Sequence, residues 1–105
     1  MITHDTINQI AEKLRKGAPE ATFMLFGSYA RGDAGENSDL DILVIEPVVK
    51  ARRREMVRLS DILRPLHVPV DIIVVSRDNF EKWADFPGTI IYNAAKEGRI
   101  LDAAA

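Results

Sequence analysis

The chain has 105 residues, of which 47% are apolar and 29% are charged, a content that suits one folded domain spanning residues 1–105. Its formal net charge of −2 excludes a general attraction for nucleic acid, so we expect none as a direct partner. The absence of cysteine excludes disulfides and thiolate zinc sites, and no apolar leader or membrane-length apolar run is present, so we expect a cytoplasmic protein without membrane contact.

The first predicted element is an amphipathic helix, because its apolar positions recur every three or four residues. Thr3 or Asp5 is the expected cap, and Gly17 the expected end. The apolar residues of this helix are Ile7, Ile10, Ala11 and Leu14. The apolar run 23–26 then predicts a buried strand.

Gly27 and Ser28 follow that strand, where the chain must turn sharply into a short helical piece around residues 29–31. Glycine permits a positive φ and a close approach of backbone. The Ser28 hydroxyl and the unpaired N–H groups of the turn can bind an anion. This turn therefore predicts a site for a triphosphate.

Residues 38–45 predict a second strand, on which Asp39 and Asp41 share one face because strand side chains alternate. Their Cα atoms are expected about 6.5 Å apart, close enough for both carboxylates to bind magnesium ions about 3.5–4 Å apart. Carboxylate oxygens are ligands that magnesium prefers. The alternative is that Asp39 ends a turn and Asp41 faces solvent on an edge strand.

A helical pattern over residues 49–66 precedes a third predicted strand, residues 70–75, which contains Asp71. If this strand lies beside the second one, Asp71 projects from the same end of the sheet as the other two acids. It can then bind one metal ion and accept a proton from an attacking hydroxyl. The alternative is an exposed strand start without a chemical role.

The last third of the chain predicts shorter elements. Ser76 is the expected cap of one helix, and helical spacing resumes over residues 89–96 before Gly98. Residues 99–101 predict a short edge strand, and the alanines at 103–105 are expected to fray.

The order G-S-x-A-R-G from Gly27, S-D-x-D from Ser38 and a later strand aspartate resembles the minimal nucleotidyltransferases of the DNA polymerase beta superfamily. The resemblance implies an α/β (α+β) nucleotidyltransferase fold, with a short mixed sheet and helices packed mainly on one face. It implies an enzyme with two Mg²⁺ ions that transfers a nucleoside monophosphate to a hydroxyl. Gly27, Ser28, Arg31 and Ser38 would lie on the nucleotide side, although Arg31 can equally pair with Asp33 or a motif aspartate.

Proteins this short in the family resemble antitoxins that pair with a HEPN-type ribonuclease toxin and transfer AMP from ATP to a toxin tyrosine. The resemblance thus implies ATP as substrate and a HEPN toxin as partner, with a homo-oligomer or hetero-complex as the assembly. Two alternatives remain open. The chain can neutralise its partner by binding alone, or it can modify a small molecule of the aminoglycoside type.

Overall fold

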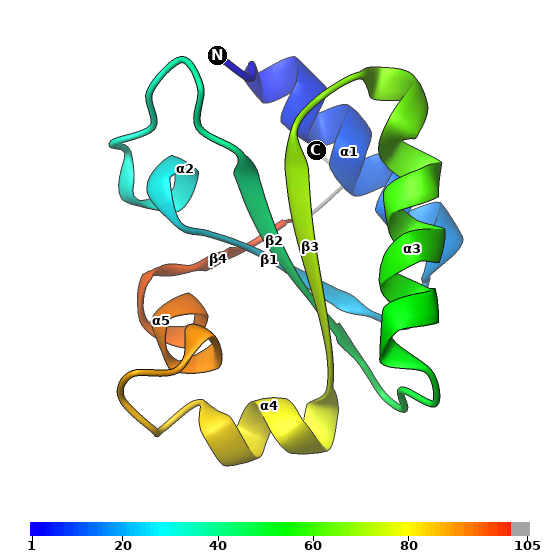
Figure 1. The fold of residues 1–105 in the computed structure, drawn as a ribbon, viewed down its shortest axis with the longest axis vertical. Helices are drawn as coiled ribbons and strands as arrows, with labels where there is room; N and C mark the ends of the chain where they lie inside the picture. Colours follow the sequence, from blue (N-terminus) through cyan, green and yellow to red (C-terminus); the bar gives the residue numbers. More distant parts are fainter. Residues whose placement is uncertain (102–105) are drawn as a thin grey trace.

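The computed structural model describes residues 1–101, and their strands form one four-stranded mixed sheet in the order β3-β2-β1-β4 (Figure 1). Strand β2 lies antiparallel to β1 and parallel to β3, whereas the short β4 lies antiparallel to β1. The bounds are Thr22–Phe26 for β1, Leu40–Glu46 for β2, Val70–Ser76 for β3 and Arg99–Ile100 for β4. The predicted mixed sheet is therefore confirmed.

Five α-helices and one 3₁₀ turn connect and cover these strands within the described residues. Helix α3 links β2 to β3, as parallel neighbours require a crossover connection. Three helices are capped by hydroxyls, because Thr3, Ser76 and Thr89 accept hydrogen bonds from the first turns of α1, α4 and α5. The bounds are His4–Gly17 for α1, Ser28–Arg31 for α2, Arg52–Leu63 for α3, Arg77–Trp83 for α4, Ile90–Glu97 for α5 and Arg64–Leu66 for the 3₁₀ turn.

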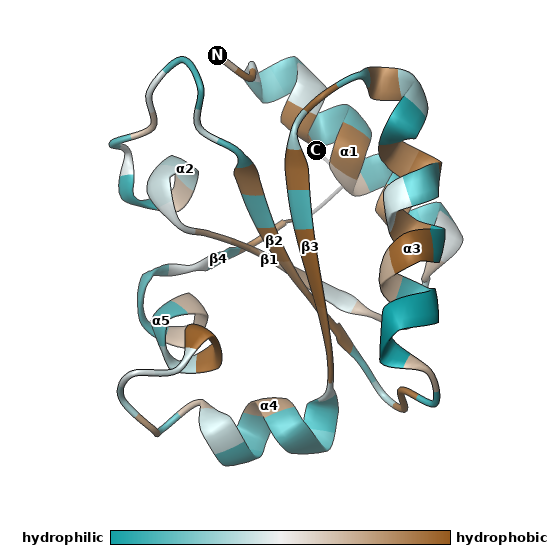
Figure 2. Ribbon diagram, viewed as in Figure 1, coloured by the Kyte–Doolittle hydropathy of each residue, from teal (hydrophilic) through white to brown (hydrophobic). Residues whose placement is uncertain are grey.

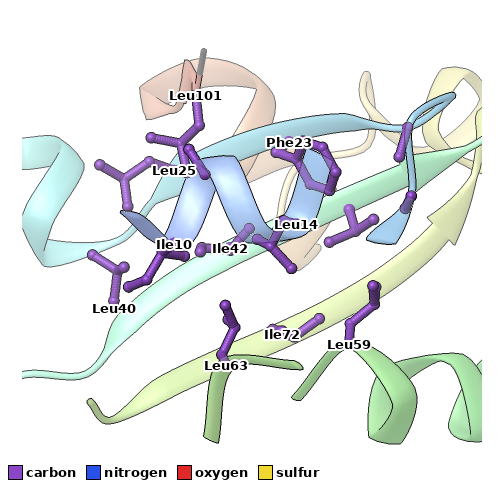
Figure 3. Packing of buried hydrophobic residues seen from close by; sticks show 14 of the residues in the cluster. Ile10, Leu14, Phe23, Leu25, Leu40, Ile42, Leu59, Leu63, Ile72 and Leu101 are labelled. Atoms are coloured by element: carbon purple, nitrogen blue, oxygen red, sulfur yellow. The ribbon is translucent and has the colours of Figure 1, made fainter. Parts of the chain in front are cut away.

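The larger core lies between α1, α3 and one face of the sheet. Alternate residues of β1, β2 and β3 point to it, as strand geometry requires. Figure 3 shows how side chains from both helices meet those of the strands; they include Ile10, Leu14, Phe23, Leu25, Ile42, Leu59, Leu63 and Ile72. The predicted apolar stripe of the first helix is buried in this core.

A smaller core on the opposite face lies under the short helices α4 and α5, and includes Phe26, Leu43, Ile45, Val75 and Ala94. Helix α5 lies against β1, and α4 lies at the end of β3, away from the beginnings of β2 and β3 (Figure 1). A hydrophilic band interrupts each of these two hydrophobic strands near its beginning (Figure 2). This face therefore has a covered apolar end and an uncovered polar end.

Most predicted elements agree with the structure, with small shifts at their ends. The second strand begins at Leu40, so Asp39 precedes it, and the helix predicted over residues 49–66 is α3 followed by the 3₁₀ turn that contains Pro65. The fraying expected at residues 103–105 falls outside the described residues. Within residues 1–101, no helix is long and apolar enough to cross a membrane.

Candidate active site

The Gly27 turn connects the end of β1 to α2. Gly27 has φ 75°, a conformation that favours glycine, and its carbonyl accepts hydrogen bonds from the N–H groups of Ala30 and Arg31. A side chain at this position would collide with the Asp41 carboxylate, since a Cβ would lie 3.1 Å from the Asp41 Cγ. The glycine thus lets the turn approach a predicted metal ligand closely.

The register of β2 and β3 brings the predicted acids together. Asp41 lies directly opposite Asp71 in these parallel strands. Both alternate with residues of the larger core, so they project from the face that carries α4 and α5. Asp39 immediately precedes β2 and is exposed, as is Asp71, whereas Asp41 is partly buried.

The electrostatics at Asp41 are dominated by burial and by negative neighbours. Burial raises the pKa of the Asp41 carboxyl above its ordinary value, and the charges of Asp71 and Asp39 raise it further. Glu97 acts in the same direction, and Arg31 opposes them. A bound cation would therefore stabilise the ionised carboxylates.

The donor set fits a hard divalent cation, because its oxygens are carboxylates crowded at one end of the sheet. Within residues 1–101, no three carboxylate or imidazole side chains converge into a ready-made metal centre. Asp39, Asp41 and Asp71 are thus brought to one place but not into a closed coordination shell.

Glu97 is a site residue that sequence reasoning missed. Its Oε1 atom accepts a hydrogen bond from the Gly27 N–H at 3.1 Å and another from the Arg31 guanidinium at 3.1 Å. Glu97 ends α5, and Gly98 lets this end lie against β1, because a Cβ there would collide with the Ala94 carbonyl and lie 3.0 Å from the Leu25 carbonyl. Separated from Gly27 by 70 residues, Glu97 carries no local signal in the sequence.

Arg31 and Ser38 shape the loops around the acids. Arg31 pairs with Asp33, at 3.3 Å, and with Glu97, so one of the alternatives left open for Arg31 is observed. These hydrogen bonds, first that to Asp33, raise the pKa of Arg31. The Ser38 hydroxyl accepts a hydrogen bond from the Gly35 N–H at 2.8 Å and so holds the loop that leads to Asp39.

Tyr29 follows Ser28 at the beginning of α2. Its hydroxyl accepts a hydrogen bond from the Ile2 N–H at 3.0 Å, and its ring packs against the larger core. That core lies on the sheet face opposite the acids. The geometry therefore gives Tyr29 a packing role.

The comparisons with known proteins agree with this geometry. A family model described as "Nucleotidyltransferase domain" matches residues 7–101. The "Putative protein adenylyltransferase MJ0604" of Methanocaldococcus jannaschii is 36% identical over 78 residues, which are 74% of each chain.

Two solved structures share the fold. A toxin-antitoxin structure with AMP-PNP has a TM-score of 0.64 at 22% identity, over 90% of this chain and 70% of that one. The structure of a tri-AMPylated Shewanella oneidensis HEPN toxin with an MNT antitoxin has a TM-score of 0.57 at 18% identity, over 90% and 66% of the two chains. With a family model that matches nearly all of its sequence, the chain belongs to the nucleotidyltransferase domain family and is a nucleotidyltransferase.

Proposed function

We propose that this chain is a magnesium-dependent protein adenylyltransferase that transfers AMP from ATP to a tyrosine of a HEPN-type toxin and so acts as its antitoxin. The observation that carries the proposal is the register that sets Asp41 opposite Asp71, beside the close approach of Gly27 to Asp41. We also infer that residues 1–105 form one domain and act in the cytoplasm.

In the proposed reaction, the acceptor hydroxyl oxygen forms a bond to the α-phosphorus of ATP. The bond between that phosphorus and the bridging oxygen breaks, and pyrophosphate leaves. Asp71 accepts the hydroxyl proton, because it is exposed at the edge strand where an acceptor can approach. Gly27 and Ser28 hold the triphosphate on the β1 side of Asp41, away from Asp71 on β3.

Asp39 and Asp41, together with Asp71, would hold the two magnesium ions. When bound, magnesium would neutralise phosphate charge during the transfer. Glu97 and Arg31 keep the Gly27 turn against Asp41 through the hydrogen bonds described above. Catalysis then rests on positioning and charge neutralisation, as is general for phosphoryl transfer.

The names of similar proteins support the finer parts of the proposal. The relative in Methanocaldococcus jannaschii is named as a protein adenylyltransferase, which supports a protein as acceptor. Structures of the same fold contain AMP-PNP in one case and an AMPylated HEPN toxin in another, which supports ATP and this class of partner.

The test is a transfer assay with labelled ATP, magnesium and a HEPN protein encoded beside this gene. We expect label on that protein, none when magnesium is chelated, and none with Asp39→Asn or Asp41→Asn. Full transfer by both variants would refute the metal assignment. If the double variant Asp39→Asn/Asp71→Asn transfers nothing yet suppresses the toxin at wild-type potency, the chain is an antitoxin by binding alone.

A further inference from the structure

An apolar groove of about 540 Å³ runs along the second half of the edge strand β3. Residues 73–76 form its floor, and its walls come from α4, the beginning of α5, Val49 and Arg52 at the beginning of α3. Its size is typical of sites that hold a substantial ligand. The groove is lined, among others, by Arg52, Ile73, Val75, Trp83, Ile90 and Ile91.

Large apolar side chains of this groove are left in contact with solvent. The beginning of α5 is hydrophobic (Figure 2). There Ile90 is 54% exposed, and Trp83 is 37% exposed. Phe86 lies beside Trp83, with tilted rings whose centroids are 5.2 Å apart, and is also exposed. Aromatic and aliphatic groups exposed together around a hollow are typical of a binding surface.

The groove begins next to the proposed proton acceptor. Ile73 lies two residues beyond Asp71 on the same strand and the same face, a separation of about 6.5 Å. The Gly27 turn follows β1, and β2 separates β1 from β3. A molecule in the groove would therefore approach Asp71 from the side opposite the proposed triphosphate site.

The groove favours an inserted side chain over an added strand. An exposed edge strand can pair with an incoming strand through its free carbonyl and N–H groups. Here the Val74 carbonyl accepts a hydrogen bond from the Arg52 side chain at 2.9 Å, which covers this part of the edge. A binding partner would therefore be recognised through a side chain that enters the apolar groove, not through pairing with β3.

Among the described residues that line the groove, Arg52 is the charged one, and its charge is positive. Four of the five residues from 50 to 54 are Lys or Arg, although the whole chain has a formal charge of −2. Arg52 lines the groove, and Lys50 and Arg53, on the same segment, are exposed. An acidic segment would complement this rim and would be attracted to it over distances of about 10 Å.

We propose that this groove binds the acceptor polypeptide. The polypeptide inserts an aromatic or aliphatic side chain beside Trp83 and Ile90, and it presents acidic residues to Lys50, Arg52 and Arg53. A hydroxyl near the inserted side chain then reaches Asp71. The inference rests on the proposed protein adenylyltransferase function and names its acceptor site. It assigns to the acceptor a sequence in which an apolar anchor and acidic residues lie close to the modified hydroxyl.

The test uses two synthetic peptides without tryptophan, each with a tyrosine and a phenylalanine two residues away. One carries flanking glutamates, and the other carries lysines in their place. Trp83 is the one tryptophan of the chain and lines the groove, so its fluorescence reports occupancy. We expect the acidic peptide to change this fluorescence and to receive AMP at least about tenfold faster than the lysine peptide.

Matched variants test whether the groove and its basic residues cause the preference for the acidic peptide. Ile90→Asp should raise the KM for the acidic peptide at least about tenfold, whereas Val57→Asp should not, because Val57 is equally exposed, at 59%, but lies outside the groove. Lys50→Glu/Arg53→Glu should abolish the preference between the peptides, and Lys13→Glu/Lys16→Glu on α1 should preserve it. Thermal melting must show that each variant is folded.

Nucleotide binding separates failure of this inference from failure of the proposed function. If the wild-type chain binds no ATP with magnesium, the proposed function itself fails. If it binds ATP but the acidic peptide neither binds nor is modified faster than the lysine peptide, the groove is not the acceptor site. An increase in KM for ATP, and not for the peptide, with Ile90→Asp would assign the groove to the nucleobase and overturn the inference.

Discussion

The two ends of β2 each carry a partly buried carboxylate, but they differ in what surrounds it. Asp41, near the beginning, faces Asp71 and lies near Asp39. Glu46, at the end, lies beside Glu55. Glu55 in turn pairs with Arg58. Within residues 1–101, Asp39, Asp41 and Asp71 form no salt bridge, whereas Glu55 of the second group pairs with Arg58.

The second cluster balances its own charge. Burial and the neighbouring Glu55 raise the pKa of Glu46 to about 7, so a protonated Glu46 can donate to the Glu55 carboxylate. Arg58 and that hydrogen bond lower the pKa of Glu55 to about 2. Arg58 also donates to the Gly17 carbonyl at 2.9 Å and so joins α3 to α1. A carboxylate pair that is compensated in this way has a structural role, whereas an uncompensated one at an open sheet end is suited to bind a cation.

The largest expected difference between the two ends is in activity. Asp41→Asn should lower AMP transfer at least about 100-fold, because a magnesium ligand supplies several kcal/mol to the transition state. The same variant should unfold at the same or a slightly higher denaturant concentration, since it removes repulsion from Asp71. Glu46→Gln, measured in the same transfer and urea assays, should retain near wild-type transfer. Equal losses of transfer in both variants would show that the two ends of β2 do not differ in function.

The close approach of Gly27 to Asp41 gives the next largest effect. Gly27→Ala and Gly88→Ala both place a side chain at positive φ, which costs about 1–2 kcal/mol of unfolding free energy. Only the Gly27 substitution also displaces the Asp41 carboxylate, because nothing lies within 4 Å of a Cβ at Gly88. We therefore expect Gly27→Ala to lower transfer at least tenfold beyond any effect of Gly88→Ala, as measured by kcat/KM.

Glu97 gives the next effect, because its carboxylate holds the Gly27 turn through a hydrogen bond. Glu97→Ala leaves the Gly27 N–H without its partner, so we expect about 1 kcal/mol less stability and a several-fold higher KM for ATP. Glu97→Gln keeps an oxygen that can accept from Gly27 and should restore most of the stability. A lower KM for ATP in Glu97→Ala would instead show that this carboxylate competes with the triphosphate.

The smallest effect is the pH dependence of stability at the Glu46 end. The pKa of Glu46 is higher in the fold, about 7, than its ordinary value of 4.5, so its contribution is full below pH 4.5 and is lost as the pH rises through 7. The unfolding free energy should fall, on the order of 1 kcal/mol, from pH 5 to pH 8. Urea unfolding of Glu46→Gln should show a smaller fall over the same pH range.

Most of the fold could be predicted from local patterns. The apolar repeat of α1, the runs that form β1 and β3, and the hydroxyl cap of α4 are each contained in a few neighbouring residues, and the structure agrees with them. The beginning of β2 was predicted two residues early, because alternation continues through Ser38 and Asp39 although pairing with β1 and β3 starts later.

The motif residues and their spacing follow from the amino-acid sequence alone: Gly27 at a sharp turn, Asp39 and Asp41 around the start of a strand, and Asp71 near the start of another. Short-range geometry decides these features, and a resemblance to a family follows from them. The register that sets Asp41 opposite Asp71, the contact of Glu97 with the Gly27 turn, and the groove beside Trp83 were decided only by the tertiary structure. Each joins residues about 20 to 70 positions apart, and long-range packing, which leaves no local pattern, is what brings them together.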